Sequence, residues 1–528
     1  MPDAESRQTL VLSLLLALAC LMAVWIYEGR SGALNSDLGG DPDEAAHAVT
    51  ALMIRDYLAE GLGQHPMKFA RTYYEHFPRV ALGHYPPLYY LVASLPLLVR
   101  AEVDVLFGLQ ALFLAILAVQ SWLLLRRFVP GGLALMAALL GCSLPLALKL
   151  VQHVMSDVLL AVLCLWAVFA WADYLRSPSI RRALFWGCIA AAAILTKGSG
   201  MMLCVLPPLA TILTGQWRLI RHLSWWCAAL PVAVLAGPWM IYSTGISAEG
   251  MTGMTPWQYF KEAVPYYLEA MPQAFGWGLT GLMLAGLVFG LREVIRARMI
   301  SPLAASLLAL AAGAVAVLLL VPVGLTTRYL LTLVPAIMLA AAFGVWRLLP
   351  GLVGRRRSQA ASLALGAAFA LTAGLPLKQV NGYAEAVRLA GAPSPSEAEE
   401  RWLISSDPRG EGAVVAAAAF QSASRAPARL QVYRGGKELA SSDWMGRGYQ
   451  KVVETPEALL KLLDEKRITW IMVDLSVPLE KRRPHDLLLK KTLAGAAPAW
   501  KLVKEQPIVR RGGQERGTLL VYQRSSAS

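Results

Sequence analysis

Residues 10–27 read LVLSLLLALACLMAVWIY, a stretch with no charged side chain that follows a short polar start. A helix needs about 20 such residues to cross the hydrocarbon core of a bilayer. No cleavage site of small residues follows, so we predict a retained anchor rather than a removed signal peptide. With this run, the sequence predicts about eleven spans. The others lie at 105–125, 132–149, 157–175, 183–197, 199–214, 223–242, 274–291, 302–321, 329–346 and 360–375.

The composition agrees with a polytopic membrane protein. Of 528 residues, 56% are hydrophobic and 16% are charged, and the mean hydropathy is +0.49. These values exclude a soluble multidomain enzyme, a disordered chain and a disulfide scaffold. In a membrane protein, excess Arg and Lys, here a net charge of +14, orient the spans and contact anionic lipids. We therefore expect no nucleic acid partner. All six cysteines lie in apolar stretches, as small buried hydrophobic residues do.

Arginine clusters on every second connection predict the orientation of the spans. The clusters are Arg126 and Arg127; Arg176, Arg181 and Arg182; Arg218 and Arg221; Arg292, Arg296 and Arg298; and Arg347, Arg355, Arg356 and Arg357. The positive-inside rule assigns these connections and the N-terminus to the cytoplasm. The first long loop and everything after residue 377 are then extracytoplasmic. In a bacterium, they would face the periplasm or the exterior of the inner (plasma) membrane.

One apolar segment, at 86–99, is only about fourteen residues long, which is short of the ~20 that a span requires. We predict that it forms an interfacial or re-entrant helix on the outer face. A crossing here would invert the parity of every later arginine cluster. The outer position of the first loop therefore depends on this assignment.

The chain changes character near its end, which divides it into two domains. We expect a transmembrane domain at 1–376, in which loop 28–104 carries juxtamembrane helices, and a soluble α/β domain at 377–528. In the second domain, the patterns predict strands at 401–406, 469–474, 500–503 and 518–523, and helices after Asp407 and from Thr455 to near Lys466. The predicted fold class is a multi-pass α-helical membrane protein with a C-terminal extracytoplasmic α/β domain.

Acidic residues stand out at two places on the predicted outer face. Asp43 and Glu44 open an amphipathic helix in the first loop, and Asp43 and His47 share one helical face at i, i+4. Asp157 begins a later span on the same membrane face. Such acids commonly offset a helix dipole. The alternative is that a carboxylate serves as a general base at the membrane surface.

Histidines and basic residues share this outer face. His47, His65, His76, His84 and His153 all lie there, but no spacing of zinc-ligand type is present, so a divalent metal is left open and no cofactor is assigned. Lys197 separates two apolar runs, and Arg328 opens a span. Cations at helix ends usually extend to lipid headgroups. Both residues are also placed to hold a lipid-linked phosphate.

These residues resemble the polytopic GT-C glycosyltransferases of the protein O-mannosyltransferase-like superfamily (glycosyltransferase family 39). This group includes bacterial aminoarabinose and galacturonosyl transferases that act on lipid A or lipopolysaccharide core. Four landmarks occur in family order: Asp43-Glu44, Pro86-Pro87-Leu88-Tyr89-Tyr90, Thr196-Lys197-Gly198, and Arg328-Tyr329 with Pro335 six residues on. Asp157 matches the second acid of the family. The resemblance covers residues 10 to 350 and omits the C-terminal domain.

The resemblance implies transfer of a hexosyl or pentosyl group from a polyprenyl-phosphate donor, with inversion, to a hydroxyl or phosphate of a lipid, glycan or protein acceptor. Asp43 would be the general base, Glu44 would shape the site, and Asp157 would place the acceptor or tune the base. Lys197 and Arg328 would neutralise the departing lipid phosphate. Tyr329 would bind the donor lipid phosphate together with these two cations, and the supporting residues would be His47, His84, Tyr85 and His153. The family often has His or Lys directly before Pro-Pro, whereas Tyr85 intervenes here, which leaves the role of His84 open.

Two other classes of function compete with this interpretation. A transporter would be expected to carry ionisable or broken segments at mid-membrane and repeat symmetry, whereas the charges here gather at span ends. An O-antigen ligase or polymerase would use a diphosphate-linked glycan, without the Asp43-Glu44 arrangement. A scaffold protein without activity is a further alternative, because one sequence does not show that the acids are used.

Overall fold

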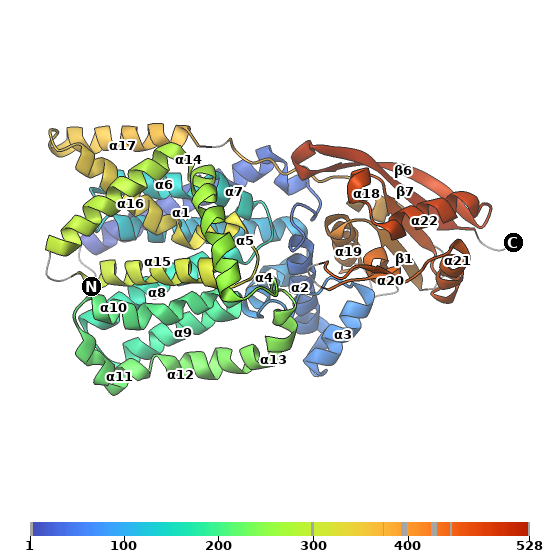
Figure 1. The fold of residues 1–528 in the computed structure, drawn as a ribbon, viewed down its shortest axis with the longest axis horizontal. Helices are drawn as coiled ribbons and strands as arrows, with labels where there is room; N and C mark the ends of the chain where they lie inside the picture. The colour runs from blue at the N-terminus through green and yellow to red at the C-terminus, as the bar shows by residue number, and fades with distance from the viewer. Residues whose placement is uncertain are drawn as a thin grey trace.

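The computed structural model describes residues 4–296, 300–372, 374–391, 399–423, 430–443 and 446–525. A helical bundle and an α/β domain lie at opposite ends of the molecule (Figure 1). Between them lie three helices of the first loop, α2 (Glu44–Asp56), α3 (Pro66–His76) and α4 (Leu88–Val99). The N-terminus lies at the far end of the bundle, away from the α/β domain (Figure 1).

The described chain contains seven helical stretches long and apolar enough to cross a membrane. They lie in α1 (Ala4–Ser31), α5 (Val103–Leu125), α8 (Asp157–Arg176), Leu223–Ala248, α14 (Pro256–Arg296), α15 (Pro302–Leu320) and Thr327–Leu348. Leu223–Ala248 comprises α11 (Leu223–Trp226), α12 (Ala229–Pro231) and α13 (Gly237–Ala248) with a π-helical turn, and Thr327–Leu348 comprises η6 (Thr327–Leu333) and α16 (Val334–Leu348). The protein is therefore a multi-pass helical membrane protein, as predicted.

The remaining predicted spans form shorter or bent helices. α6 (Gly131–Cys142) and α7 (Pro145–Val151) meet at 55° and together qualify as an eighth stretch. α9 (Ile180–Thr196) and α17 (Gly354–Ala370) each have 17 residues. η3 (Gly198–Val205) and α10 (Leu206–Leu213) occupy the run predicted at 199–214. Each of the eleven predicted runs contains helix, but length and composition qualify only seven or eight, so eleven crossings stay a prediction.

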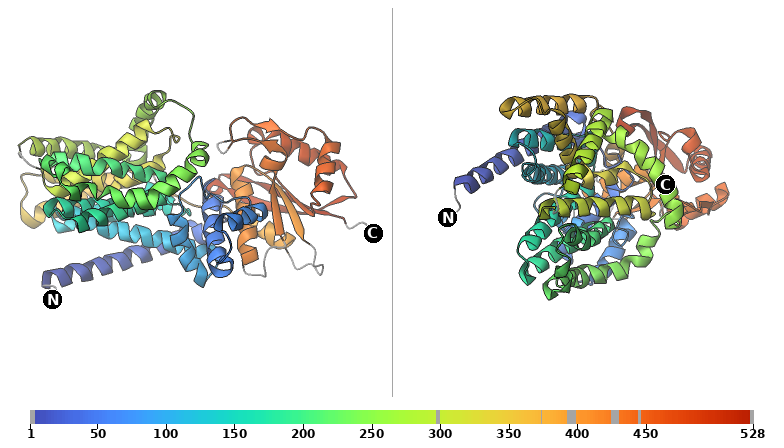
Figure 2. Two further views of the ribbon diagram at one scale, coloured as in Figure 1. Left: turned by 90° about the horizontal axis from the view of Figure 1, so that it is seen from below. Right: turned by 60° about the vertical axis from the view of Figure 1, so that its left-hand side comes forward.

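α1 is the least buried of these helices. Only 11% of its apolar window is buried, and it projects from the edge of the bundle (Figure 2). Its side chains from Leu10 to Ile26 are largely exposed and apolar, which suits contact with acyl chains. The predicted role of a retained anchor fits this position.

The C-terminal domain is built on a five-stranded mixed sheet of order β2-β1-β5-β7-β6. The strands are β1 (Glu400–Ser405), β2 (Leu430–Arg434), β5 (Trp470–Asp474), β6 (Trp500–Arg510) and β7 (Glu515–Arg524). β2, β1 and β5 are parallel, and β7 pairs antiparallel with both β5 and β6. The helices are α18 (Tyr383–Ala390), α19 (Pro408–Ala423), α20 (Gly435–Glu438), α21 (Pro456–Glu465) and α22 (Pro484–Gly495), and β3 (Ala440–Ser441) pairs with β4 (Gln450–Lys451). The predicted α/β class is confirmed.

The apolar core of the bundle continues into this domain. Successive side chains of a strand point to opposite faces, so Trp402 and Ile404 of β1 face one way and Leu403 the other. Trp402 and Ile404 belong to the same core as the bundle helices, through α2 and α19, whereas Leu403 belongs to a separate core on the outer face of the sheet. Gly412 of α19 lies against Ala45 of α2 so closely that a Cβ at this glycine would approach the alanine methyl to 3.0 Å. The α/β domain is thus packed onto the helix that follows Asp43.

Candidate active site

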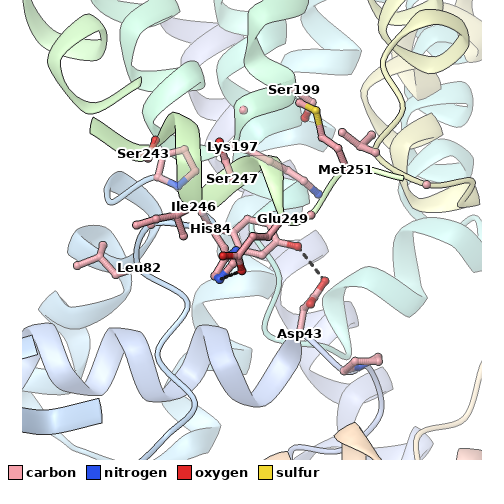
Figure 3. Close-up of a pocket in the computed structure, with 18 of the residues that line it drawn as sticks. Asp43, Leu82, His84, Lys197, Ser199, Ser243, Ile246, Ser247, Glu249 and Met251 are labelled. Carbon is pink, nitrogen blue, oxygen red and sulfur yellow. Dashed lines mark hydrogen bonds and ion pairs between the residues drawn. The ribbon is translucent and has the colours of Figure 1, made fainter. Parts of the chain in front are cut away.

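A cavity of about 1510 Å³ lies where the bundle, the first loop and the α/β domain meet. The first loop contributes Asp41, Asp43, Arg79, His84 and Tyr85 to its walls. The bundle contributes Asp157, Lys197, Tyr259, Arg328 and Tyr329, and the α/β domain contributes Arg434, Lys437 and Arg483. Figure 3 shows Asp43 and His84 on one side of this space and Lys197 on another.

Local backbone structure places Asp43 at the mouth of α2. The amide of Gly40 donates to Glu44 Oε2 at 2.9 Å, and the amide of Asp43 donates to Asp41 Oδ1 at 3.0 Å, which closes a tight turn before the helix. The Asp43 side chain does not cap the helix but points into the cavity. Its Oδ2 accepts hydrogen bonds from Tyr85 Oη at 2.8 Å and from Arg328 Nη1 at 3.0 Å.

The surroundings of Asp43 keep it ionised. Burial alone would raise the pKa of this carboxyl, but Arg328, with smaller contributions from His47 and Tyr85, outweighs burial and lowers the pKa to about 2. A carboxylate that is deprotonated at every physiological pH can accept a proton. While Arg328 neutralises it, however, it is a weak base.

A second acid and a second cation form another ion pair on the wall of the cavity. Lys197 Nζ lies 2.7 Å from Asp157 Oδ1, and these side chains are only 7% and 4% exposed. The other oxygen of Asp157 has no hydrogen-bond partner within the described chain. Lys197 and Arg328 both lie over the ring of Tyr329, at 4.9 Å and 5.4 Å from its centroid. Tyr329 thus links the two cations through cation–π contacts.

Both cations lie where the chain passes from one segment to the next helix. Lys197 is extended between α9 and η3, and a Cβ at Gly200 would lie 2.6 Å from the backbone of Ala193, so the turn after Lys197 requires glycine. Thr326 caps η6, and its hydroxyl accepts a hydrogen bond from the amide of Arg328 at 3.4 Å. Each cation therefore lies at a helix terminus beside the cavity, as the sequence predicts.

Three of the predicted site residues lie behind the cavity wall. Glu44 is fully buried and pairs with Lys378 of the linker to the α/β domain. His47 Nδ1 lies 2.9 Å from Tyr90 Oη, and burial lowers its pKa to about 4, so its ring is neutral at pH 7. His153 Nδ1 contacts the carbonyl of Lys149 at 2.5 Å. Their predicted roles stay predictions.

The other seven predicted residues line the cavity: Asp43, Asp157, Lys197, Arg328, Tyr329, His84 and Tyr85. His84 Nε2 lies 3.9 Å from Glu249 Oε2. Tyr259 lies in the Tyr- and Trp-rich range 257–267, where the sequence predicts part of the donor pocket. The sequence did not single out Asp41, Arg79 or Glu249, nor the basic residues of the α/β domain. Only Asp41 carried a signal, because it lies two residues before Asp43.

Metal binding is not assigned to this site. Within the described residues, no group of three or more His, Cys, Asp and Glu side chains is placed to hold a metal ion. The chemistry below is derived from the charged side chains of the chain itself.

No protein-family model matches the sequence, and no curated protein matches it. The fold of this chain, in which a helical bundle, juxtamembrane helices and an α/β domain surround one cavity, is shared with solved glycosyltransferase structures. ArnT from Cupriavidus metallidurans, bound to undecaprenyl phosphate, superposes over 96% of this chain and 97% of its own with a TM-score of 0.56 at 15% identity. Its apo state gives a TM-score of 0.55 at 14% identity over the same shares.

The oligosaccharyltransferase of Archaeoglobus fulgidus in its apo form also shares the fold. The match covers 87% of this chain and 69% of the archaeal one, with a TM-score of 0.52 at 12% identity. Likeness at such low identity establishes the fold. The GT-C fold predicted from the four landmarks is thereby confirmed.

Proposed function

We propose that this protein is an integral membrane glycosyltransferase that moves a sugar from a polyprenyl-phosphate donor to an acceptor hydroxyl or phosphate. The observation that carries the proposal is the pairing of two acids with two cations on the walls of one cavity: Asp43 with Arg328, and Asp157 with Lys197. The ArnT structure of the same fold was solved with undecaprenyl phosphate bound, which supports a polyprenyl phosphate as the carrier.

The cavity suits an amphipathic donor. One part of its wall is apolar and is formed by Leu160, Met201, Met202, Val317, Leu318 and Val321 of the bundle. An isoprenoid chain would lie on this wall, since lipid tails bury apolar surface. Its phosphate would then lie by Lys197 and Arg328, where preorganised positive charge stabilises the negative charge that develops on the leaving group.

The reaction is a single displacement at the anomeric carbon. Asp43 accepts the proton of the acceptor hydroxyl, whose oxygen forms the new glycosidic bond. The bond from the anomeric carbon to the phosphate oxygen breaks, and its electron pair passes to the lipid phosphate, which Lys197 and Arg328 hold. Attack opposite to the leaving group inverts the anomeric configuration. Asp157 orients Lys197 and offers its second oxygen to the acceptor.

Donor binding would also activate the base. In the structure, Arg328 neutralises Asp43 at 3.0 Å. A lipid phosphate that draws on the same guanidinium removes part of this countercharge, so the pKa of Asp43 rises and the carboxylate becomes a stronger base. Asp43 would therefore be most basic when the donor is in place.

We place the site on the extracytoplasmic face of a bacterial inner membrane, with the N-terminus in the cytoplasm and the C-terminal domain in the periplasm or outside. The arginine-rich connections support this orientation. A membrane-impermeant thiol reagent should label single cysteines at the exposed Gly63 and Lys501 in intact cells. Labelling only after the membrane is permeabilised would contradict the orientation.

The central test uses purified protein in lipid nanodiscs that contain bacterial envelope lipids as acceptors. A panel of undecaprenyl-phosphate-linked hexoses and pentoses is supplied, and release of undecaprenyl phosphate is measured by mass spectrometry. Asp43→Asn should lower the rate about 1,000-fold, within the range for loss of a general base, while still binding undecaprenyl phosphate. An unchanged rate in Asp43→Asn, or release only from diphosphate-linked glycans, contradicts the proposal.

A further inference from the structure

Behind the cavity wall, the first loop is joined to the segment that leads into the α/β domain. This segment, residues 376–380, follows α17 and is called the strap here. The amide of Lys378 donates to the carbonyl of Ser31 at 3.1 Å, and the carbonyl of Lys378 accepts from Ser36 Oγ at 2.9 Å. The amide of Asp37 donates to the carbonyl of Val380 at 2.6 Å. The strap and the loop are thus hydrogen-bonded along residues 31–37.

The Lys378 side chain lies behind the turn formed by residues 40–43, called the Asp43 turn here. Its ammonium forms an ion pair with Glu44, in which the lysine side chain is 1% exposed and the glutamate 0%. The same ammonium lies 4.5 Å from the centroid of the Phe107 ring in α5. Glu28 is a second fully buried carboxyl in the field of Lys378, and its two oxygens have no hydrogen-bond partner in the described structure. Lys378 is therefore the cation that pairs with the buried Glu44 carboxylate.

Glu44 connects Lys378 to the turn. One of its oxygens pairs with Lys378, and the other accepts the amide of Gly40 at 2.9 Å. The turn has little space to shift, since a Cβ at Gly40 would come within 2.3 Å of His153 Nε2, and one at Gly39 within 3.1 Å of Val380. The turn is thus enclosed by the strap, His153 and the Glu44 carboxylate, and Asp43 lies at its end.

We propose that Lys378 is a positioning residue for sugar transfer: by neutralising Glu44 beneath the turn, it fixes the Asp43 carboxylate in the cavity. The inference rests on the proposed function, because it takes Asp43 as the base. Positioning of this kind has a large effect on rate, since a displacement of about 1 Å at a reacting group lowers the rate by about 100-fold. Lys378 itself does not touch the substrate.

The test separates positioning from stability. Lys378→Met alone leaves Glu44 buried without its cation, so that variant can fail to fold. The double variant Glu44→Leu with Lys378→Met removes both charges together and leaves an apolar pair of similar volume, which commonly preserves stability. We expect it to fold, with a melting temperature above that of Lys378→Met but below that of the wild type, because the Gly40 amide loses its acceptor. It should keep its affinity for undecaprenyl phosphate, because Lys197 and Arg328 are unchanged. Its kcat should fall about 100-fold, with KM for the donor altered less than threefold.

Gln379→Met is the matched control, because Gln379 is next on the strap but its side chain lies beside Gly513 of the α/β domain. It should retain the wild-type kcat. A double variant that folds, binds undecaprenyl phosphate and keeps the wild-type kcat overturns the positioning role, provided that Asp43→Asn is inactive in the same assay. Full activity of Asp43→Asn would instead contradict the proposed function, so the two failures are distinguishable.

Discussion

Asp43 and Glu44 are neighbours in the sequence but lie in opposite environments. The Asp43 side chain is 18% exposed, faces the cavity and pairs with Arg328, whose side chain is 19% exposed. Glu44 is 0% exposed and pairs with Lys378 at 1%. The first pair lines the cavity, whereas the second lies behind its wall. Under the proposed function, this acidic dipeptide supplies one group for chemistry, Asp43, and one group that holds the turn in place, Glu44.

The largest expected difference between the two pairs is in stability. Lys378→Met should lower the free energy of unfolding by about 3–5 kcal/mol, because it leaves a fully buried carboxylate without its cation. Arg328→Met should lower the free energy of unfolding less, by about 2 kcal/mol, because Asp43 lines the cavity and is partly exposed there. Denaturant titration in detergent micelles measures both values. Equal losses would show that the two pairs do not differ in solvation.

Gly40→Ala tests how tightly the turn is enclosed. The added methyl would collide with His153 Nε2, and overpacking of this kind costs about 1–3 kcal/mol. Gly63→Ala in the same loop has open space around its Cβ and serves as a control, although its positive φ of 100° adds some strain of its own. Thermal unfolding of both variants gives the comparison. A Gly40→Ala variant more stable than Gly63→Ala would contradict the enclosed turn.

The pH dependence of the reaction tests the cavity pair. Arg328 helps to hold the pKa of Asp43 at about 2, below its ordinary 3.8, so the wild-type kcat/KM should show no acid limb from Asp43 above pH 4. Arg328→Gln removes this cation and leaves burial, which raises the pKa, so an acid limb should appear at higher pH. By the same linkage, the stability that the pair contributes is present above pH 4 and is lost as the pH falls towards 2. An acid limb at the same pH in the wild type and in Arg328→Gln would belong to a group other than Asp43.

The smallest expected effect comes from Tyr85. Tyr85→Phe removes a hydrogen bond of 2.8 Å to the Asp43 carboxylate but leaves the ring in place. A hydrogen bond to a charged group contributes about 1.5–3 kcal/mol, of which water in the cavity recovers part, so we expect a rate about tenfold lower. Steady-state kinetics with undecaprenyl-phosphate-linked sugars measure the change. A drop as large as that of Asp43→Asn would make Tyr85 a catalytic residue itself.

The sequence predicts the cavity pairs better than the buried pair. Asp157, Lys197 and Arg328 are charged residues at the ends of apolar runs, where lipid disfavours charge, and positive-inside parity places all three on one face. Lys378 lacks this signal. It lies in a short polar segment, 334 residues from Glu44, and only the tertiary fold brings them together.

In the α/β domain, too, the sequence predicts the elements that have a clear local pattern and misses one that lacks it. Its predicted strands at 401–406 and 469–474 match β1 and β5 closely, because buried strands are continuous apolar runs. β2 (Leu430–Arg434) was missed, because it is only five residues long, contains the polar Gln431 and Arg434, and buries only Val432 fully. Arg434 and Lys437 reach the cavity because β2 ends there, so missing the strand meant missing its cavity residues.

The core shared by the bundle, α2 and α19 bears on how this protein can be re-engineered or diversified. A domain that merely rests on a membrane enzyme can be exchanged for another at a linker. Here a foreign domain would leave the apolar surface around Ala45 exposed, unless it supplied a helix with a glycine at the position of Gly412, where α19 packs closely against Ala45. The α/β domain should therefore diversify through its loops, with α2 and α19 inherited as a unit.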